Sequence, residues 1–221
     1  MNNDEKLKPE IIENAKLYIK KIFQDDYSGH DFFHTMRVYR TAAYIAKREN
    51  ADIYIVKLAA LLHDVDDIKL SPDTHADKNR ALLFMQSNKV SVKVCKSVLS
   101  IIGQVSYTGK DSVIPDTIEG KCVQDADRLD ALGAIGIARA FAYGGSRNRQ
   151  IYNPEIKPRM NMGKNEYQHH ISTTVNHFYE KLFYLKDIDE YRYGKTYCTA
   201  KRKIYEKFYF RIFNRMEYGR Y

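Results

Sequence analysis

Histidine and aspartate occur in this sequence in an order that suits a metal centre. His34 and the adjacent pair His63-Asp64 both lie in segments with helical periodicity. Divalent ions bind imidazole nitrogens and carboxylate oxygens at roughly 2.0–2.3 Å from rigid elements. Asp66 and Asp67 follow the pair, so three carboxylates fall within four positions and repel one another unless a cation or water surrounds them. Taken alone, the pair is more simply a solvated acidic helix end.

A second acidic run, 125-DADRLD-130, lies inside an otherwise apolar segment. Carboxylates in such a helix are costly unless a cation pairs with them, and Arg128 can neutralise only about one of the three. Asp127 and Asp130 are three positions apart and share a helix face, whereas Asp125 lies about 200° around the helix from Asp127. The spacing therefore favours a further ligand in this run but does not choose between Asp127 and Asp130.

Helical periodicity runs through nearly the whole chain, and no strand-like alternation persists. The predicted helices cover residues 10–23, 31–48, 52–64, 77–87, 91–103, 117–141, 167–186 and 189–215. Pro9 suits the start of the first helix, and Asp52 is a candidate N-cap of the third. The glycine-rich stretch 143–166 lacks a clear period and is expected to be a mobile, functional loop. The pattern predicts an all-α protein.

Composition narrows the class of protein. A chain of 221 residues with 44% hydrophobic residues can bury one sizeable core. No apolar run is long enough for a membrane span, and the polar N-terminus lacks the apolar stretch of a signal peptide. Three scattered cysteines without a CxxC motif are expected to be reduced. We therefore expect a cytoplasmic protein, monomeric or homodimeric, without a membrane partner.

The net charge of +8 favours a phosphate-bearing ligand. A positive excess of this size attracts both nucleic acid and small nucleotides, so charge alone does not decide between them. Much of the excess lies in the C-terminal segment 201–221, whose simplest interpretation is a solvated helix face with aromatic core contacts.

Together, His34, His63-Asp64 and 126-ADRL-129 resemble the H…HD…D signature of the HD superfamily of metal-dependent phosphohydrolases. The resemblance spans about residues 25–215 and is similar to the YpgQ/YedJ-like branch in three stretches: 29-GHDFFHTMRV-38, 123-VQDADRLDALGAIGIARAFAYGG-145 and 176-NHFYEKLFYLKD-187. It implies a single all-α domain, an HD-domain helical bundle with additional C-terminal helices. The HD core would cover about 25–145, the mobile stretch 143–166, and the C-terminal helices 167–215.

The resemblance also implies four metal ligands: His34, His63, Asp64 and Asp127. Asp127 is chosen because the last ligand of the family precedes an Arg-Leu pair, and Asp130 would then support the ligands without binding the ion. Two-metal members insert extra histidines between the His-Asp pair and the last aspartate, where this chain has only His75. One divalent ion is therefore expected. Nitrogen and oxygen ligands without thiolate favour Mn²⁺, with Fe²⁺, Co²⁺, Ni²⁺ and Mg²⁺ as alternatives.

By the same resemblance, the expected activity is hydrolysis of nucleoside triphosphates to a nucleotide and pyrophosphate by a metal-activated water. Asp67, three residues beyond Asp64, is the candidate acceptor of the water's proton, with Asp66 as a weaker choice. Basic side chains are expected to hold the phosphates. The main candidates are His30, Arg37, Lys78 and Lys164, with Arg147, Arg149 and Arg159 in the same loop as Lys164.

Two other functions remain open from the sequence. A phosphodiesterase or nuclease could use the same residues on cyclic nucleotides or oligonucleotides. A non-catalytic, basic helical module could bind nucleic acid and carry a vestigial metal site. The second alternative is disfavoured because every part of the signature is intact, whereas a vestigial site would be expected to have lost a ligand.

Overall fold

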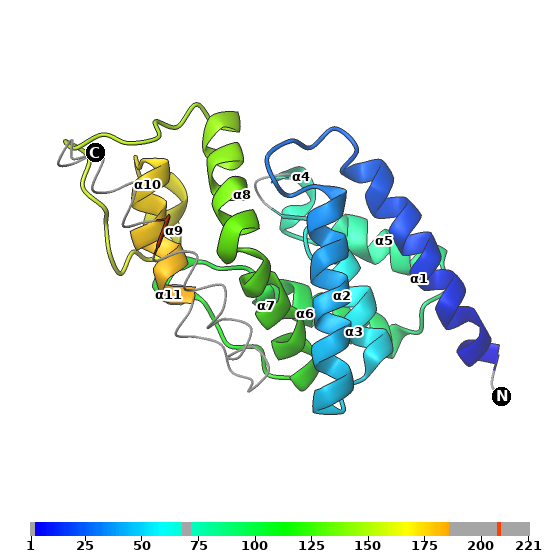
Figure 1. Ribbon diagram of the computed structural model, residues 1–221. Coiled ribbons are helices and arrows are strands. Elements are labelled where there is room, and N and C mark those ends of the chain that lie inside the picture. Colours follow the sequence, from blue (N-terminus) through cyan, green and yellow to red (C-terminus); the bar gives the residue numbers. More distant parts are fainter. Residues whose placement is uncertain (1–2, 68–71, 186–206, 209–221) are drawn as a thin grey trace. The chain divides into compact units, whose positions relative to one another are not determined.

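The computed structural model describes residues 3–67, 72–185 and 207–208. Every regular element in these ranges is helical, which confirms the all-α prediction (Figure 1). The chain divides into two compact units, the first formed by residues 1–26, 30–106 and 113–126 and the second by residues 27–29, 107–112 and 127–221. Helix α7 (Ile118–Asp130) begins in the first unit and ends in the second.

Helix α3 (Ile53–Leu62) is at the centre of the first unit, because it packs against three other helices: α1 (Asn3–Ile22), α2 (Phe32–Glu49) and α6 (Val92–Val105). Figure 1 shows α2 and α3 lying side by side. Residues 58–62 of α3 are all fully buried and apolar, as expected of a helix surrounded by others. The pair His63-Asp64 thus follows directly on the most enclosed helix of this unit.

Capping residues fix where α2 and α3 begin. The side chain of Asp31 accepts a hydrogen bond from the backbone N of His34 at 2.6 Å and caps α2. The Asp52 carboxylate accepts from two backbone N–H groups in the first turn of α3. Both caps satisfy donors that have no partner within the helix. The predicted starts at 31 and 52 are therefore confirmed to within a residue.

The remaining helices of the first unit are α4 (Pro72–His75) and α5 (Asn79–Ser87), and α5 packs on both α4 and α6. Helix α1 begins at Asn3, so Pro9 lies inside it and the prediction that Pro9 marks its start was wrong. A proline so near the beginning of a helix removes only one intrahelical hydrogen bond, and Pro9 itself is exposed.

The predicted single helix over 117–141 was also wrong. The structure has two helices here, α7 and α8 (Gly133–Ser146), separated at Ala131 and Leu132. Gly133 has a φ of 76°, in the left-handed region that glycine adopts at little cost, and this conformation interrupts the helical path. The break leaves the acidic run of residues 125–130 at the end of a helix, whereas the sequence placed it in the middle of one.

The second unit is built from short helical pieces. After α8 come α9 (Lys164–His169), α10 (Thr174–His177), a π-helical turn (Phe178–Leu182) and α11 (Phe183–Leu185), and a 3-10 turn (Gly109–Asp111) contacts α9. Residues 170–173 thus interrupt the predicted helix 167–186, and the predicted loop 143–166 is helical at both ends. The predicted helix 189–215 and the segment 201–221 lie outside the described residues, except for 207 and 208.

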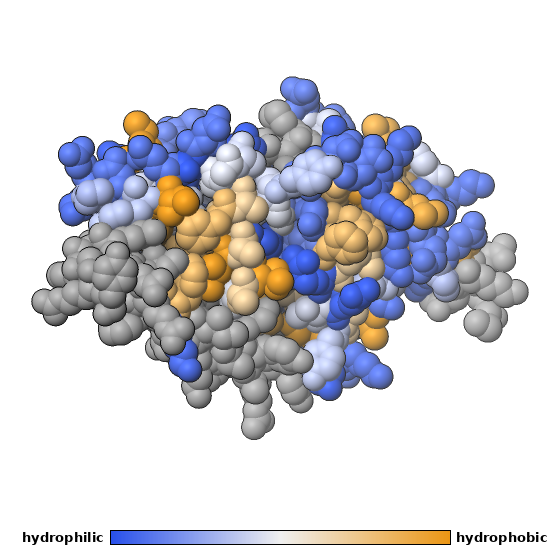
Figure 2. Space-filling view, turned by 45° about the horizontal axis from the view of Figure 1, so that its top comes forward, coloured by the Kyte–Doolittle hydropathy of each residue, from blue (hydrophilic) through white to orange (hydrophobic). Residues whose placement is uncertain are grey.

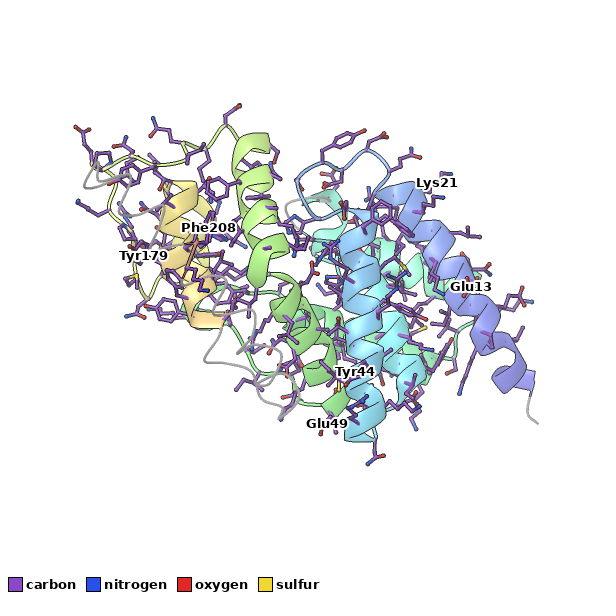
Figure 3. All side chains as sticks on the ribbon, viewed as in Figure 1. Glu13, Lys21, Tyr44, Glu49, Tyr179 and Phe208 are labelled. Atoms are coloured by element: carbon purple, nitrogen blue, oxygen red, sulfur yellow. The ribbon has the colours of Figure 1, made fainter. Side chains whose placement is uncertain are left out.

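Aromatic and carboxylate contacts join these pieces within the second unit. The ring of Phe178 lies 6.1 Å from that of Phe141 and 6.0 Å from that of Phe208, which Figure 3 labels beside Tyr179. The buried carboxylate of Glu180 accepts hydrogen bonds from Ser172 Oγ at 2.7 Å and from the backbone N of Arg159 at 3.2 Å. His170 Nε2 lies 2.9 Å from the same carboxylate. Glu180 therefore ties residues 159–172 to the π-helical turn.

On the face drawn in Figure 2, apolar side chains lie among hydrophilic ones, as on most protein surfaces. Within the described ranges, no helix combines the length and the apolar composition that crossing a membrane demands.

We predict that Glu180→Ala destabilises the protein by at least about 2 kcal/mol, because it removes a buried acceptor and leaves its donors without their bonds. Urea unfolding measures the loss. Glu166→Ala is the matched control, since that carboxylate is exposed and lies 3.6 Å from the Arg159 guanidinium, an ion pair worth under about 1 kcal/mol. Equal losses in the two variants would contradict the role given to Glu180.

Candidate metal centre

His34 lies in the first turn of α2 with its imidazole fully buried. Its backbone N is fixed by Asp31, so the residue is held at the position where the helix begins. The imidazole Nε2 lies 3.2 Å from Oδ2 of Asp64, and the ring meets that of His63 edge-on with centroids 5.4 Å apart. Two histidines from different helices therefore face the same carboxylate oxygen.

His63 caps the C-terminal end of α3, and its Nδ1 lies 2.9 Å from the carbonyl oxygen of Ala60. A carbonyl oxygen only accepts hydrogen bonds, so Nδ1 carries the proton and Nε2 of the neutral ring carries the lone pair. That Nε2 lies 3.2 Å from Asp64 Oδ2. The backbone of α3 thus sets both the tautomer and the orientation of a nitrogen that can bind a cation.

Asp64 stays ionised in spite of its burial. Desolvation by itself raises the pKa of this carboxyl group, but His63 and His34, when they present a proton to it, outweigh desolvation and hold the pKa well below 3.8, its ordinary value. A carboxylate oxygen 3.2 Å from an imidazole lone pair is repelled by it unless a cation lies between them. The three groups consequently require a shared proton or a shared metal ion.

A divalent ion fits the spacing of these atoms. Donors that bind one ion at about 2.1 Å lie roughly 3.0–3.5 Å from one another, in octahedral or tetrahedral coordination. Both distances from Asp64 Oδ2 to the imidazole nitrogens are 3.2 Å. The donor set contains nitrogen and oxygen and no sulfur, which is the chemistry of Mn²⁺, Fe²⁺ and related ions as well as of Zn²⁺.

Asp127 follows Ala126 without interruption in α7, and its side chain is half-buried. Single ligand atoms of His34, His63 and Asp127 all lie within 4.8 Å of one another, so these residues could hold a divalent metal ion. The spacing alone left Asp127 and Asp130 as equal candidates, and the family resemblance selected Asp127. The structure pairs Asp130 Oδ2 with Arg139 Nη1 at 3.0 Å, so one cation partner of Asp130 is the guanidinium of Arg139.

The two acids that follow the His-Asp pair differ in their surroundings. Asp66 is buried, and its two oxygens accept hydrogen bonds from the backbone N atoms of Arg80 at 3.2 Å and Ala81 at 2.9 Å. Asp66 therefore holds the first turn of α5. Asp67 is half-exposed, and its backbone N donates to the carbonyl oxygen of Asp64 at 3.1 Å. Of the two, Asp66 is the one whose carboxylate oxygens are shown to bond to the start of α5.

The predicted phosphate-binding residues are distributed over several elements. The ring of His30 lies 5.9 Å from that of His34, and Arg37 is half-buried one turn further along α2. Lys78 precedes α5 with a φ of 50°, and its Cε lies close to Gly103 of α6. Lys164 begins α9, where its backbone N donates to Asp111 Oδ2 at 2.7 Å and its side chain is exposed.

Three further arginines were candidates for phosphate binding, and His75 was the histidine between the His-Asp pair and the last aspartate. Arg147 and Arg149 both approach the ring of Tyr143, at 5.5 and 5.9 Å from its centroid. Arg159 forms an exposed ion pair with Glu166. The side chain of His75 lies outside the described part of the structure.

Sequence reasoning missed two residues that organise this region. Asp31 was placed at the start of a helix but not recognised as the cap that holds His34, although an aspartate three positions before a helical residue is a known capping pattern. Arg139 was not singled out at all. It pairs with Asp130 across nine positions and a helix break, and no local spacing rule connects residues so separated.

Comparison with known proteins adds to this geometry. A family model described as HD domain matches residues 31–132. YpgQ of Bacillus subtilis, described as an uncharacterized protein, is 39% identical over 182 residues, which cover 80% of this chain and 79% of YpgQ.

Three solved structures are similar to this chain in both fold and sequence. A protein from Lactobacillus plantarum has a TM-score of 0.84 at 35% identity, and the match covers 92% of this chain and 95% of the Lactobacillus chain. An HD-superfamily hydrolase from Bacillus thuringiensis has a TM-score of 0.70 at 37% identity, covering 96% and 99%. The complex of YpgQ with ADP has a TM-score of 0.72 at 31% identity, covering 94% and 98%.

We predict that Mn²⁺ raises the melting temperature of chelator-stripped protein, because an ion that binds only the folded state stabilises it by about 2.7 kcal/mol at 100 times its Kd. Differential scanning fluorimetry follows the shift. His34→Ala and Asp64→Ala should each abolish it, since each removes one of the converging atoms. If Mn²⁺ raises the melting temperature of both variants as much as that of the wild type, the ion binds elsewhere.

Proposed function

Because this chain belongs to the HD-domain superfamily, we propose that it is a metal-dependent phosphohydrolase that cleaves nucleoside triphosphates to a nucleotide and pyrophosphate. The observation that carries the proposal is the convergence of His34 Nε2 and His63 Nε2 on one buried carboxylate oxygen of Asp64. Such an arrangement is stable at neutral pH with a cation among the three atoms. The ADP held by the related YpgQ supports a nucleotide as the ligand.

The proposed ligands are His34, His63, Asp64 and Asp127, and the proposed ion is a single Mn²⁺. These four side chains would hold the ion, which would also accept water and a phosphoryl oxygen as ligands. When bound there, the ion supplies Lewis acidity, which makes a water more acidic and a phosphorus atom more electrophilic. The buried histidines and the helix-end aspartate hold this charge in a fixed place, so little reorganisation accompanies the reaction.

Asp67 is the proposed proton acceptor. It is three residues from the ligand Asp64, is half-exposed, and belongs to a turn closed by its own backbone hydrogen bond to Asp64. Its carboxylate takes the proton of the attacking water and returns it to solvent. Asp66 is less suited to this step because its oxygens already accept bonds from the first turn of α5.

Basic side chains are proposed to hold the phosphates. Arg37 lies one turn beyond His34 on the same helix, where a guanidinium can donate two parallel hydrogen bonds to phosphate oxygens. His30 borders the His34 ring. Lys78 and Lys164 complete the proposed set as point charges, and the overall charge of +8 attracts an anionic substrate.

We predict that metal-stripped protein supplied with Mn²⁺ converts nucleoside triphosphates to monophosphate and pyrophosphate, measured by chromatography of the products. His63→Ala and Asp64→Ala should lower the rate to background. The same assay includes cyclic nucleotides and short oligonucleotides. Turnover of these in preference to triphosphates would replace the proposal with a phosphodiesterase or nuclease, and tight oligonucleotide binding without turnover would identify a non-catalytic module.

Substitutions of the proposed proton acceptor and of the proposed phosphate-binding residue are expected to change different kinetic constants. Asp67→Asn should lower kcat by about 10²–10⁴-fold with little change in KM, because it removes proton transfer and not binding. Arg37→Met should chiefly raise KM. Asp25→Asn, at an exposed position beyond α1, is the control and should leave both constants unchanged. A full wild-type kcat in Asp67→Asn would rule out Asp67 as the base.

A further inference from the structure

Arg139 joins two separate segments of the second unit through one guanidinium. Its Nε donates a hydrogen bond to the carbonyl oxygen of Gly29 at 2.6 Å, and its Nη1 donates to Oδ2 of Asp130 at 3.0 Å. The side chains of Arg139 and Asp130 are only 15% and 7% exposed. A charge-assisted contact so well shielded from water is stronger than a surface ion pair and fixes both partners in direction.

The first segment approaches Arg139 very closely. Gly29 has a φ of 94°, and a Cβ at this position would lie 3.2 Å from both Cβ and Cγ of Arg139. Glycine therefore lets the backbone lie directly on the arginine stem. Two residues later Asp31 caps α2 and holds the backbone N of His34. The anchored carbonyl thus lies immediately ahead of the segment that orients the first proposed metal ligand.

The second segment is the end of α7. Asp130 is its last residue and lies three positions beyond Asp127, on the same helix face. The helical path breaks directly afterwards, where Gly133 has a φ of 76° and starts α8. The bond from Arg139 in α8 back to Asp130 closes over this break and fixes the last turn of α7, from which Asp127 projects.

We propose that Arg139 is a positioning residue of the metal centre, which fixes the backbone ahead of His34 and the helix turn that carries Asp127. The inference rests on the proposed metal ligands but not on the substrate. The planar guanidinium donates along two directions at once, which the single ammonium of lysine cannot reproduce at both partners. Removing a group that orients a metal ligand typically weakens metal binding, even though that group does not touch the ion.

The test is Mn²⁺ binding to the metal-stripped full chain, measured by isothermal titration calorimetry with the metal alone. Arg139→Met retains the apolar stem and removes both donors, and it should raise the Kd for Mn²⁺ by about 10–100-fold. Arg139→Lys should fail to restore wild-type affinity. Arg40→Met makes the same chemical change at an exposed position of α2 and should leave the Kd unchanged.

A merely structural role gives a different result. If Arg139→Met melts at a lower temperature but binds Mn²⁺ with the wild-type Kd below that temperature, the proposal is overturned. Should Arg139→Met not fold, Arg139→Lys and Asp130→Asn carry the test, and wild-type affinity in both overturns it. A double-mutant cycle of Arg139→Lys with Asp130→Asn should show non-additive losses of metal affinity, since both changes act on one contact; additive losses count against it.

The calorimetry also separates this proposal from the proposed function. A wild-type protein that binds Mn²⁺ but hydrolyses no nucleotide would sink the function and leave the role of Arg139 intact. A wild-type protein that hydrolyses triphosphates with Mn²⁺, and whose Arg139 variants keep the wild-type Kd, would sink only the role of Arg139. Absence of Mn²⁺ binding in the wild type would overturn both.

Discussion

The approach of two imidazole nitrogens to one carboxylate oxygen is the constraint on which this protein depends. His34 Nε2 and His63 Nε2 both lie 3.2 Å from Asp64 Oδ2, in surroundings from which water is largely excluded. Without a cation, lone pairs and negative charge would repel one another where screening is weakest. The fold holds these atoms together because a proton or a metal ion resolves that repulsion.

Rigid helices produce this approach. Residues 58–62 of α3 are apolar and fully buried, so the end of the helix that carries His63 has little freedom to move. Its backbone also decides which nitrogen of His63 carries the proton, through the carbonyl oxygen of Ala60. Asp31 gives His34 a comparable fixed start on α2. The geometry of the proposed ligands is therefore set by helix termini, where backbone groups without intrahelical partners are available to orient side chains.

Neighbouring aspartates of the two acidic runs are likewise distinguished by the groups that they contact. Asp64, Asp66 and Asp130 belong to two short acidic runs, yet each has a different partner: the imidazoles, the first turn of α5, and Arg139. Carboxylates crowded in sequence are tolerated because each is neutralised or bonded by a different element. A dense acidic motif therefore does not make every acid a metal ligand.

The amino-acid sequence alone was enough to predict the all-α class, the starts of the helices that carry His34 and His63, and the residue types of a candidate nitrogen-and-oxygen metal site, because periodicity, caps and ligand chemistry are local properties. The break at Gly133 could not be predicted, since a glycine in an alanine-rich segment is compatible with a continuous helix as well as with the positive φ that the structure shows. Only the tertiary structure decided that Asp130 is paired with Arg139 and Asp66 with α5. Those partners are nine and more than thirteen positions away, and local spacing carries no information about contacts at that separation.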